Sequence, residues 1–174
     1  ALWIPYITAL ATRHVWVKYA GTVILIVYLV LTINQTTTWK NEFTVWDHTL
    51  KYYQNSAKVY YNRGVEYSKM QKYNEAINDY TQSLMLQPHY LDALFNRANA
   101  YENTNNFNAA FADYTTYLTI DDKDGSVYYK RAYLNYRTGN ITEAINDVQK
   151  AEYFGFPVGA QFKKMLHSKK NPSF

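Results

Sequence analysis

The sequence predicts an all-α protein in which one transmembrane helix is followed by an α-solenoid, a row of stacked helix pairs. Two observations predict this fold. Residues 19–39 contain no charged side chain, and the chain after them repeats a pattern of small and aromatic residues every 34 positions. A third observation narrows the function: the chain has no cysteine, which excludes a disulfide framework, a thiolate metal site and a cysteine nucleophile.

The predicted transmembrane helix covers residues 19–39, between Lys18 and Lys40. Its centre, residues 23–31, is continuously apolar, and a helix needs about 20 mostly apolar residues to cross a bilayer. The alternatives are a buried helix of a soluble protein and a secretory signal peptide. Both fit less well, because no matching apolar surface follows and no small-residue cleavage site is present. The sequence therefore predicts an integral membrane protein.

Residues 1–18 form a membrane-proximal stump that ends in a basic turn. The first twelve residues are uncharged, and Arg13 and Lys18 follow them. Such a start suggests that the chain is a fragment of a larger multi-span protein. Because positive charge favours the cytoplasmic side, we expect the long C-terminal region on the non-cytoplasmic side. In a bacterium this means an inner-membrane protein with a periplasmic array.

Three units of equal length follow, at residues 57–90, 91–124 and 125–158. Aligned at an offset of 34, they share two segments: Asn62-Arg63-Gly64, Asn96-Arg97-Ala98 and Lys130-Arg131-Ala132, then residues 74–80, 108–114 and 142–148. These segments resemble the tetratricopeptide repeat (TPR), whose period is also 34 residues. The resemblance implies two antiparallel helices in each unit, stacked on those of the next.

Physical chemistry favours the same arrangement. Polar turns are predicted at residues 70–72, 104–106 and 138–140, and small residues recur where two helices must approach closely. These are Gly64 with Ala76, Ala98 with Ala110, and Ala132 with Ala144. An arginine and an aspartate recur sixteen positions apart, and we interpret them as a pair within each unit rather than as a ligand-binding row. They are Arg63 with Asp79, Arg97 with Asp113, and Arg131 with Asp147. The third unit departs from the pattern at Asn135, where the others have tyrosine, and at Val148.

The segments on either side of the repeats are predicted to be helical. Residues 40–56 form a junction helix or half repeat. Residues 159–174 form a cap helix and a basic tail, and Phe162 and Leu166 lie on the packed side of the cap helix. The run of residues 38–42 with Trp46 resembles the junction in multi-span proteins related to the protein O-mannosyltransferases, which carry TPR arrays after their last span. For residues 1–56 this resemblance implies a last membrane span, with catalytic residues upstream of this chain.

The candidate binding residues come from the TPR resemblance, which implies that the first helices of successive repeats line a concave groove. These positions are Tyr61, Phe95, Asn99, Tyr129, Tyr133 and Arg137. Rigid aromatic rings next to amides suit a peptide, because they offer contact area at low entropic cost. The alternative is that the rings only pack between helices. Asn96 matches the carboxylate clamp of chaperone-binding TPRs, but Tyr61 and Val65 replace its lysine and asparagine, so that clamp is not predicted.

Two functions remain open. The first is a membrane-anchored scaffold that binds a protein or peptide in its groove, and the second is the accessory region of a polytopic membrane glycosyltransferase. The four histidines are scattered, and residues 121–125 read as a turn between repeats rather than a calcium loop. We therefore assign no catalytic residue, metal or cofactor to this chain, and whether its parent protein is an enzyme stays open. The net charge of +4 is mild and does not predict a nucleic-acid partner.

Overall fold

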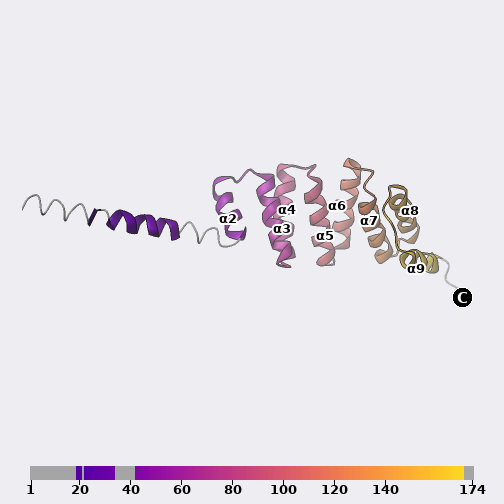
Figure 1. Ribbon diagram of the computed structural model, residues 1–174. Helices are drawn as coiled ribbons and strands as arrows, with labels where there is room; N and C mark the ends of the chain where they lie inside the picture. Colours follow the sequence, from indigo (N-terminus) through magenta and orange to yellow (C-terminus); the bar gives the residue numbers. More distant parts are fainter. Residues whose placement is uncertain (1–18, 21, 34–41, 171–174) are drawn as a thin grey trace, which may run out of the picture. The chain divides into compact units, whose positions relative to one another are not determined.

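The computed structural model describes residues 19–20, 22–33 and 42–170, and all regular structure in these ranges is helical (Figure 1). The chain divides into two compact units, residues 1–48 and 49–174. Helix α2 (Glu42–Tyr52) begins in the first unit and ends in the second. The all-α prediction is confirmed for the described part of the chain.

The first unit contains helical residues 19–20 and 22–33, whose apolar side chains are exposed. Among the residues that the structure describes, no helix is long and apolar enough to cross a membrane. The predicted transmembrane helix at residues 19–39 is therefore not supported. Part of that prediction, residue 21 and residues 34–39, lies outside the described residues, as does the predicted stump at residues 1–18.

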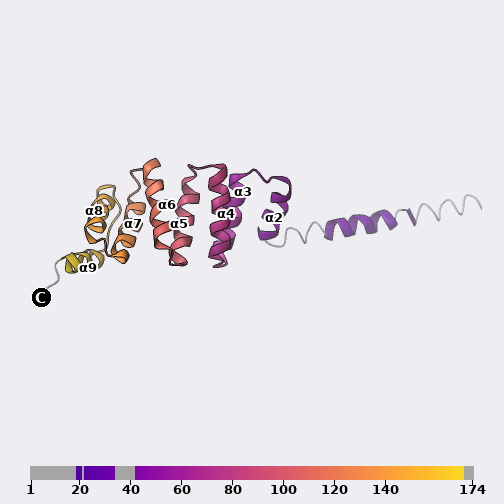
Figure 2. The ribbon, with the colours of Figure 1, turned by 180° about the vertical axis from the view of Figure 1, so that it is seen from behind.

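The second unit is a row of helix pairs closed by a single helix, and Figure 2 shows the same row from behind. The pairs are α3 (Ala57–Lys69) with α4 (Tyr73–Leu86), α5 (Leu91–Asn103) with α6 (Phe107–Ile120), and α7 (Gly125–Thr138) with α8 (Ile141–Tyr153); the last helix is α9 (Ala160–Lys170). Each pair packs closely, and α4 contacts α5 as α6 contacts α7. The α-solenoid prediction is confirmed.

The turn inside each pair has the same geometry three times. Gln71, Asn105 and Gly139, each 34 positions after the last, have positive φ angles of 59°, 58° and 86°. After each of them a backbone N–H bonds back five residues, as from Lys72 to the Tyr67 carbonyl at 2.9 Å. This left-handed closure satisfies carbonyls that a helix end leaves free. The predicted turns are confirmed.

Small residues allow the two helices of a pair to approach closely. Gly64 is buried, and Ala76, Ala98, Ala110, Ala132 and Ala144 have no exposed surface. A Cβ atom added to Gly64 would lie 2.8 Å from Cε1 of Tyr80, which is closer than carbon atoms can pack. The small residues are thus buried as predicted, and at Gly64 the absence of a side chain makes room for the Tyr80 ring of the second helix.

Each pair is also joined by a buried ion pair with two hydrogen bonds. Nε and Nη2 of Arg63 donate to the two carboxylate oxygens of Asp79, both at 2.7 Å. Arg97 donates to Asp113 at 2.8 and 2.7 Å, and Arg131 donates to Asp147 at 2.9 and 2.7 Å. This planar two-point geometry is the strong form of an arginine–carboxylate pair. The interpretation of these residues as pairs within each unit is confirmed.

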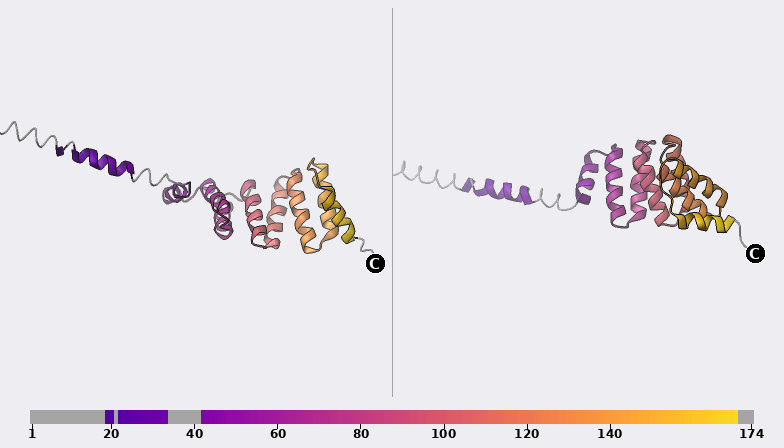
Figure 3. Two further views of the ribbon diagram at one scale, coloured as in Figure 1. Left: turned by 60° about the horizontal axis from the view of Figure 1, so that its bottom comes forward. Right: turned by 45° about the vertical axis from the view of Figure 1, so that its right-hand side comes forward.

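Helix α9 covers the end of the array. Leu166 is buried, and the ring of Phe162 stands edge-on to Tyr129 and Tyr136, with centroids 5.8 and 5.5 Å apart. Figure 3 shows α9 beside the last helix pair. Its other face carries exposed lysines, which solvate the end of the apolar core.

Buried tyrosines make the array sensitive to alkali. Burial raises the pKa of the Tyr80 phenol from near 10 to about 12, against the hydrogen bond to Ser68, which lowers it. The folded state thus favours the neutral Tyr80 phenol. The stability that the protein gains from keeping this phenol neutral is complete below pH 10 and is lost as the pH rises toward 12. We expect the denaturation midpoint, followed by circular dichroism, to fall over this interval, and phenolate absorbance to rise with it. A Tyr80→Phe variant should lose less stability between pH 10 and 12 than the parent chain.

Candidate functional site

The six predicted binding residues lie on the first helices of the three pairs, and we call the surface that they form the groove face. Tyr61, Phe95 and Tyr129 occupy the same position on α3, α5 and α7. All three are half-buried, so each ring has one part in the core and another on the surface. Their buried part shows that the rings pack in the core, and groove lining by the exposed part stays a prediction.

Aromatic neighbours hold the three rings in place. Tyr61 lies against Tyr90 with ring centroids 4.9 Å apart, and Tyr129 stacks on Phe156 at 5.1 Å. Phe95 meets Tyr114 at 5.9 Å and Tyr117 at 6.3 Å. These neighbours come from the second helices and the turns, and they make the groove face stiff rather than adaptable.

Hydrogen bonds between repeats fix the polar ends of the groove face. The phenol of Tyr61 accepts a hydrogen bond from Nδ2 of Asn96 at 3.0 Å, which links α3 to α5. Burial, and then the charge of Asp92, raise the pKa of Tyr61. Within the second repeat, the one phenol proton of Tyr114 is shared between Oε1 of Glu102, at 2.5 Å, and Oδ1 of Asn99, at 2.9 Å. The Asn99 side chain is therefore held against the core by the Tyr114 hydroxyl, which it shares with Glu102.

The third pair presents the most accessible candidates. Tyr133 and Arg137 are both exposed. The Arg137 guanidinium lies 4.8 Å from the centroid of the Phe107 ring and 5.9 Å from that of Tyr133. Phe162 of α9 lies 6.1 Å from the Tyr133 ring, so α9 covers one side of this part of the groove face. Sequence reasoning placed Phe162 on the packed side of the cap helix but did not connect it with Tyr133.

A hollow of about 250 Å³ lies at the start of α5 and α7 on the groove face. Its lining residues are Asp92, Phe95, Asn96, Tyr117, Asp124 and Ser126. Two are acidic and none is basic, which disfavours a terminal carboxylate as the occupant. Asp124 also begins α7: its Oδ1 accepts hydrogen bonds from the Ser126 N–H and hydroxyl at 2.9 and 2.6 Å. Burial alone would raise the pKa of Asp124, but these bonds and that from Tyr117 outweigh it and lower the pKa.

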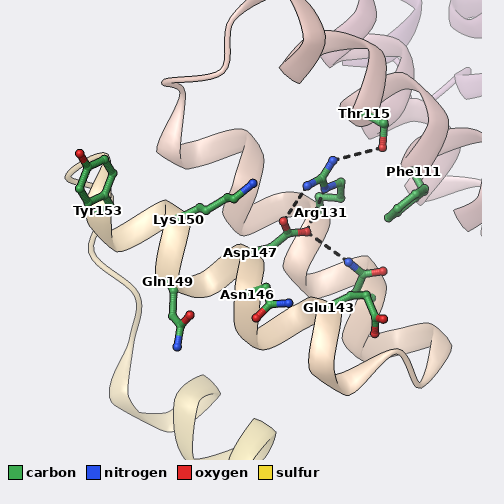
Figure 4. Close-up of a pocket in the computed structure, with 10 residues that line it drawn as sticks. Phe111, Thr115, Arg131, Glu143, Asn146, Asp147, Gln149, Lys150 and Tyr153 are labelled. Carbon is green, nitrogen blue, oxygen red and sulfur yellow. Dashed lines mark hydrogen bonds and ion pairs between the residues drawn. The ribbon is translucent and has the colours of Figure 1, made fainter.

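A second, larger cavity of about 690 Å³ is lined by residues of α6, α7 and α8 (Figure 4). Its floor is the Arg131–Asp147 ion pair. Sequence reasoning did not identify this cavity, although it noted the departure at Asn135, which lines it. Within the described ranges, no three histidine, aspartate or glutamate side chains gather in a way that could hold a metal ion.

Comparison with known proteins supports the repeat assignment. Family profiles described as tetratricopeptide repeat match residues 57–90 and 91–124, the ranges of the first two predicted repeats. They do not reach residues 1–56, so the resemblance of that segment to O-mannosyltransferase-related proteins is not shown. No curated protein matches the chain.

Several solved structures share the fold. The first TPR of Spaghetti (RPAP3), bound to the HSP90 peptide SRMEEVD, is 24 % identical, with a TM-score of 0.59 over 67 % of this chain and 92 % of that chain. MamA is 19 % identical, with a TM-score of 0.63 over 71 % and 68 % of the two chains. The Arabidopsis OM64 TPR domain is 24 % identical, with a TM-score of 0.58 over 68 % and 96 %.

At these identities the likeness establishes the fold alone. The profile matches and the helix pairs both repeat every 34 residues. Residues 57–124 are two tetratricopeptide repeats, and they lie in an all-α TPR solenoid, a protein-interaction fold.

Proposed function

We propose that the array binds an extended peptide segment of a partner protein along the groove face. The observation that carries this proposal is the row formed by Tyr61, Phe95 and Tyr129, in which each ring is fixed by neighbours yet keeps part of its surface exposed. Fixed rings contribute contact area without losing much conformational entropy when a ligand binds. Asn99, Tyr133 and Arg137 supply polar contacts beside the row.

The charges on the groove face indicate which peptides fit. The peptide in the RPAP3 structure, SRMEEVD, has three acidic residues. Here Asp92 and Asp124 line the hollow beside Phe95, and no lysine or arginine lines it. Like charges across an interface are costly. A neutral or basic segment is therefore the favoured ligand, and an acidic terminal peptide is disfavoured.

Site-specific photo-crosslinking tests the proposal. A photo-reactive phenylalanine replaces Tyr133 on the groove face or, as the matched control, Met85, which is exposed on α4. We expect adducts from position 133 and none from position 85. A synthetic peptide from the crosslinked segment should then bind at least tenfold more weakly to an Arg137→Ala variant, which corresponds to about 1.4 kcal/mol.

Two results would contradict the proposal. One is equal crosslinking from both positions. The other is a crosslinked peptide whose affinity is unchanged by Arg137→Ala in a chain that is still folded. The peptide SRMEEVD serves as the charge control, and we expect it not to compete with the crosslinked segment.

We also propose that the apolar segment anchors the chain in a membrane, with the array on the non-cytoplasmic side. What supports this is that residues 23–31 are all apolar and expose between 50 and 68 % of their surface. Such a patch is costly in water. The test is extraction of membranes with alkaline carbonate, together with a topology reporter fused after Phe174. Release of the chain into the supernatant, or a reporter active only in the cytoplasm, would contradict the proposal.

A further inference from the structure

One of the two positions at which the third unit departs from the repeat pattern lies at the larger cavity. Tyr67 and Tyr101 occupy this position in the first two pairs. Each ring lies near the arginine of its own ion pair: the guanidinium carbon of Arg63 is 5.8 Å from the centroid of the Tyr67 ring, and that of Arg97 is 5.9 Å from the centroid of the Tyr101 ring. In the third pair the residue is Asn135, whose side chain has no ring. The cavity of about 690 Å³ that opens beside it is called the Asn135 cavity below.

The floor of the Asn135 cavity is polar and held in place. Arg131 donates two hydrogen bonds to Asp147 and a longer one, 3.4 Å, to the hydroxyl of Thr115. Nδ2 of Asn135 donates to Asp147 at 3.2 Å, and the Asn135 side chain is almost fully buried, with 3 % exposed. Among the described residues, its Oδ1 accepts no hydrogen bond. Because Oδ1 is not one of the fully buried unpaired atoms, it keeps some contact with solvent, where a donor from a ligand can reach it.

The walls are apolar on one side and polar on the other. Figure 4 shows Phe111 on one side of the Arg131–Asp147 pair, with Lys150 and Asn146 on the other. The Phe111 side chain is 37 % exposed, and its ring centroid lies 5.7 Å from the Arg131 guanidinium. The remaining lining residues at the rim are Glu143, Gln149 and Tyr153.

The charges of the lining cancel. Arg131 and Lys150 contribute two positive charges, and Glu143 and Asp147 contribute two negative ones. A neutral lining complements an uncharged occupant, and it disfavours a phosphate or a nucleic acid, which would need excess positive charge. The volume falls in the range of about 300–1,000 Å³ that is usual for ligand sites. It therefore leaves room for a side chain together with the peptide backbone that carries it.

We propose that the Asn135 cavity binds an uncharged aromatic side chain, tyrosine or phenylalanine, presented by a peptide segment of a partner protein. The ring takes the place that Tyr67 and Tyr101 fill in the other pairs, next to Phe111 and the Arg131 guanidinium. A donor from the segment, a backbone N–H or a tyrosine hydroxyl, satisfies Oδ1 of Asn135. This site is separate from the groove face and gives the array a second contact surface.

The test uses the full 174-residue chain and a display library of random dodecapeptides. Peptides are selected on the parent chain and counter-selected on Asn135→Tyr, which fills the cavity with the ring that the first two pairs carry. We expect the enriched peptides to contain tyrosine or phenylalanine. Replacement of that residue by leucine should weaken binding at least tenfold in fluorescence anisotropy, and Asn135→Tyr should have an effect of the same size.

Two further variants separate this site from folding and from the groove face. Asn146→Trp fills the cavity from the exposed surface of α8, so it should reduce binding without disturbing the core, as checked by circular dichroism. Tyr133→Ala on the groove face should leave the affinity unchanged. The proposal is overturned if no peptide distinguishes the parent chain from Asn135→Tyr, if the aromatic residue is dispensable, or if folded Asn146→Trp binds as tightly as the parent chain.

Discussion

Replacing Asp113 with alanine is expected to lower the free energy of unfolding of the array by about 3 kcal/mol, measured by urea denaturation. The Arg97 and Asp113 side chains are only 17 and 8 % exposed. The substitution leaves the Arg97 guanidinium in the protein interior without its carboxylate. The cost comes from this unpaired buried charge more than from the lost attraction between the two groups.

Two controls test that explanation. Asp92→Ala removes an aspartate from the same helix pair, but Asp92 is exposed and has no ion-pair partner among the described residues, so we expect a change below about 0.5 kcal/mol. The double variant Arg97→Met/Asp113→Leu removes both charges and should be more stable than Asp113→Ala. If the double variant is instead the less stable of the two, the explanation by an unpaired charge is wrong.

Replacing Tyr114 with alanine is expected to destabilise the array by about 4 kcal/mol. The Tyr114 side chain has no exposed surface, and its ring packs on Phe95 with centroids 5.9 Å apart. Alanine at this position leaves a cavity between α6 and α5, beneath the Phe95 ring of the groove face. Thermal and urea denaturation measure the loss, and a loss below 1 kcal/mol would show that this part of the core is not packed as described.

Tyr114→Phe separates the ring from its hydroxyl. The ring stays, but Asn99 and Glu102 lose the hydrogen bond that the hydroxyl offers them. We expect a loss of about 1 kcal/mol. Because Oδ1 of Asn99 then becomes available to a ligand, the same variant should change the affinity for a groove-face peptide, whereas affinity at the Asn135 cavity should stay the same.

Much of the fold follows from the sequence because the contacts within a repeat are local and periodic. Gly64 and Ala76 lie on adjacent helices joined by a short turn, so their spacing predicts their contact. Arg63 and Asp79 are sixteen positions apart for the same reason, and the structure pairs them. The anchor prediction depends on an uncharged, mostly apolar run of residues, and no helix among the described residues is long and apolar enough to support it.

Contacts between repeats and at the end of the array had to come from the tertiary structure. The bond from Asn96 to Tyr61 spans 35 positions, and the contact of Phe162 with Tyr133 depends on how α9 folds back on the last pair. The departure at Asn135 was visible as a missing tyrosine. Whether neighbouring side chains would close the space depended on Phe111 and Lys150, which come from two other helices.

The helix pairs, their turns and the ion pair within each thus follow from the sequence, because a 34-residue period places the same side chains in the same local geometry. The accessible rings of the groove face and the cavity beside Asn135 are apparent only once the helices have packed together. Accessibility and empty volume depend on how side chains from several helices pack together, and the spacing of residues within one repeat does not encode that packing.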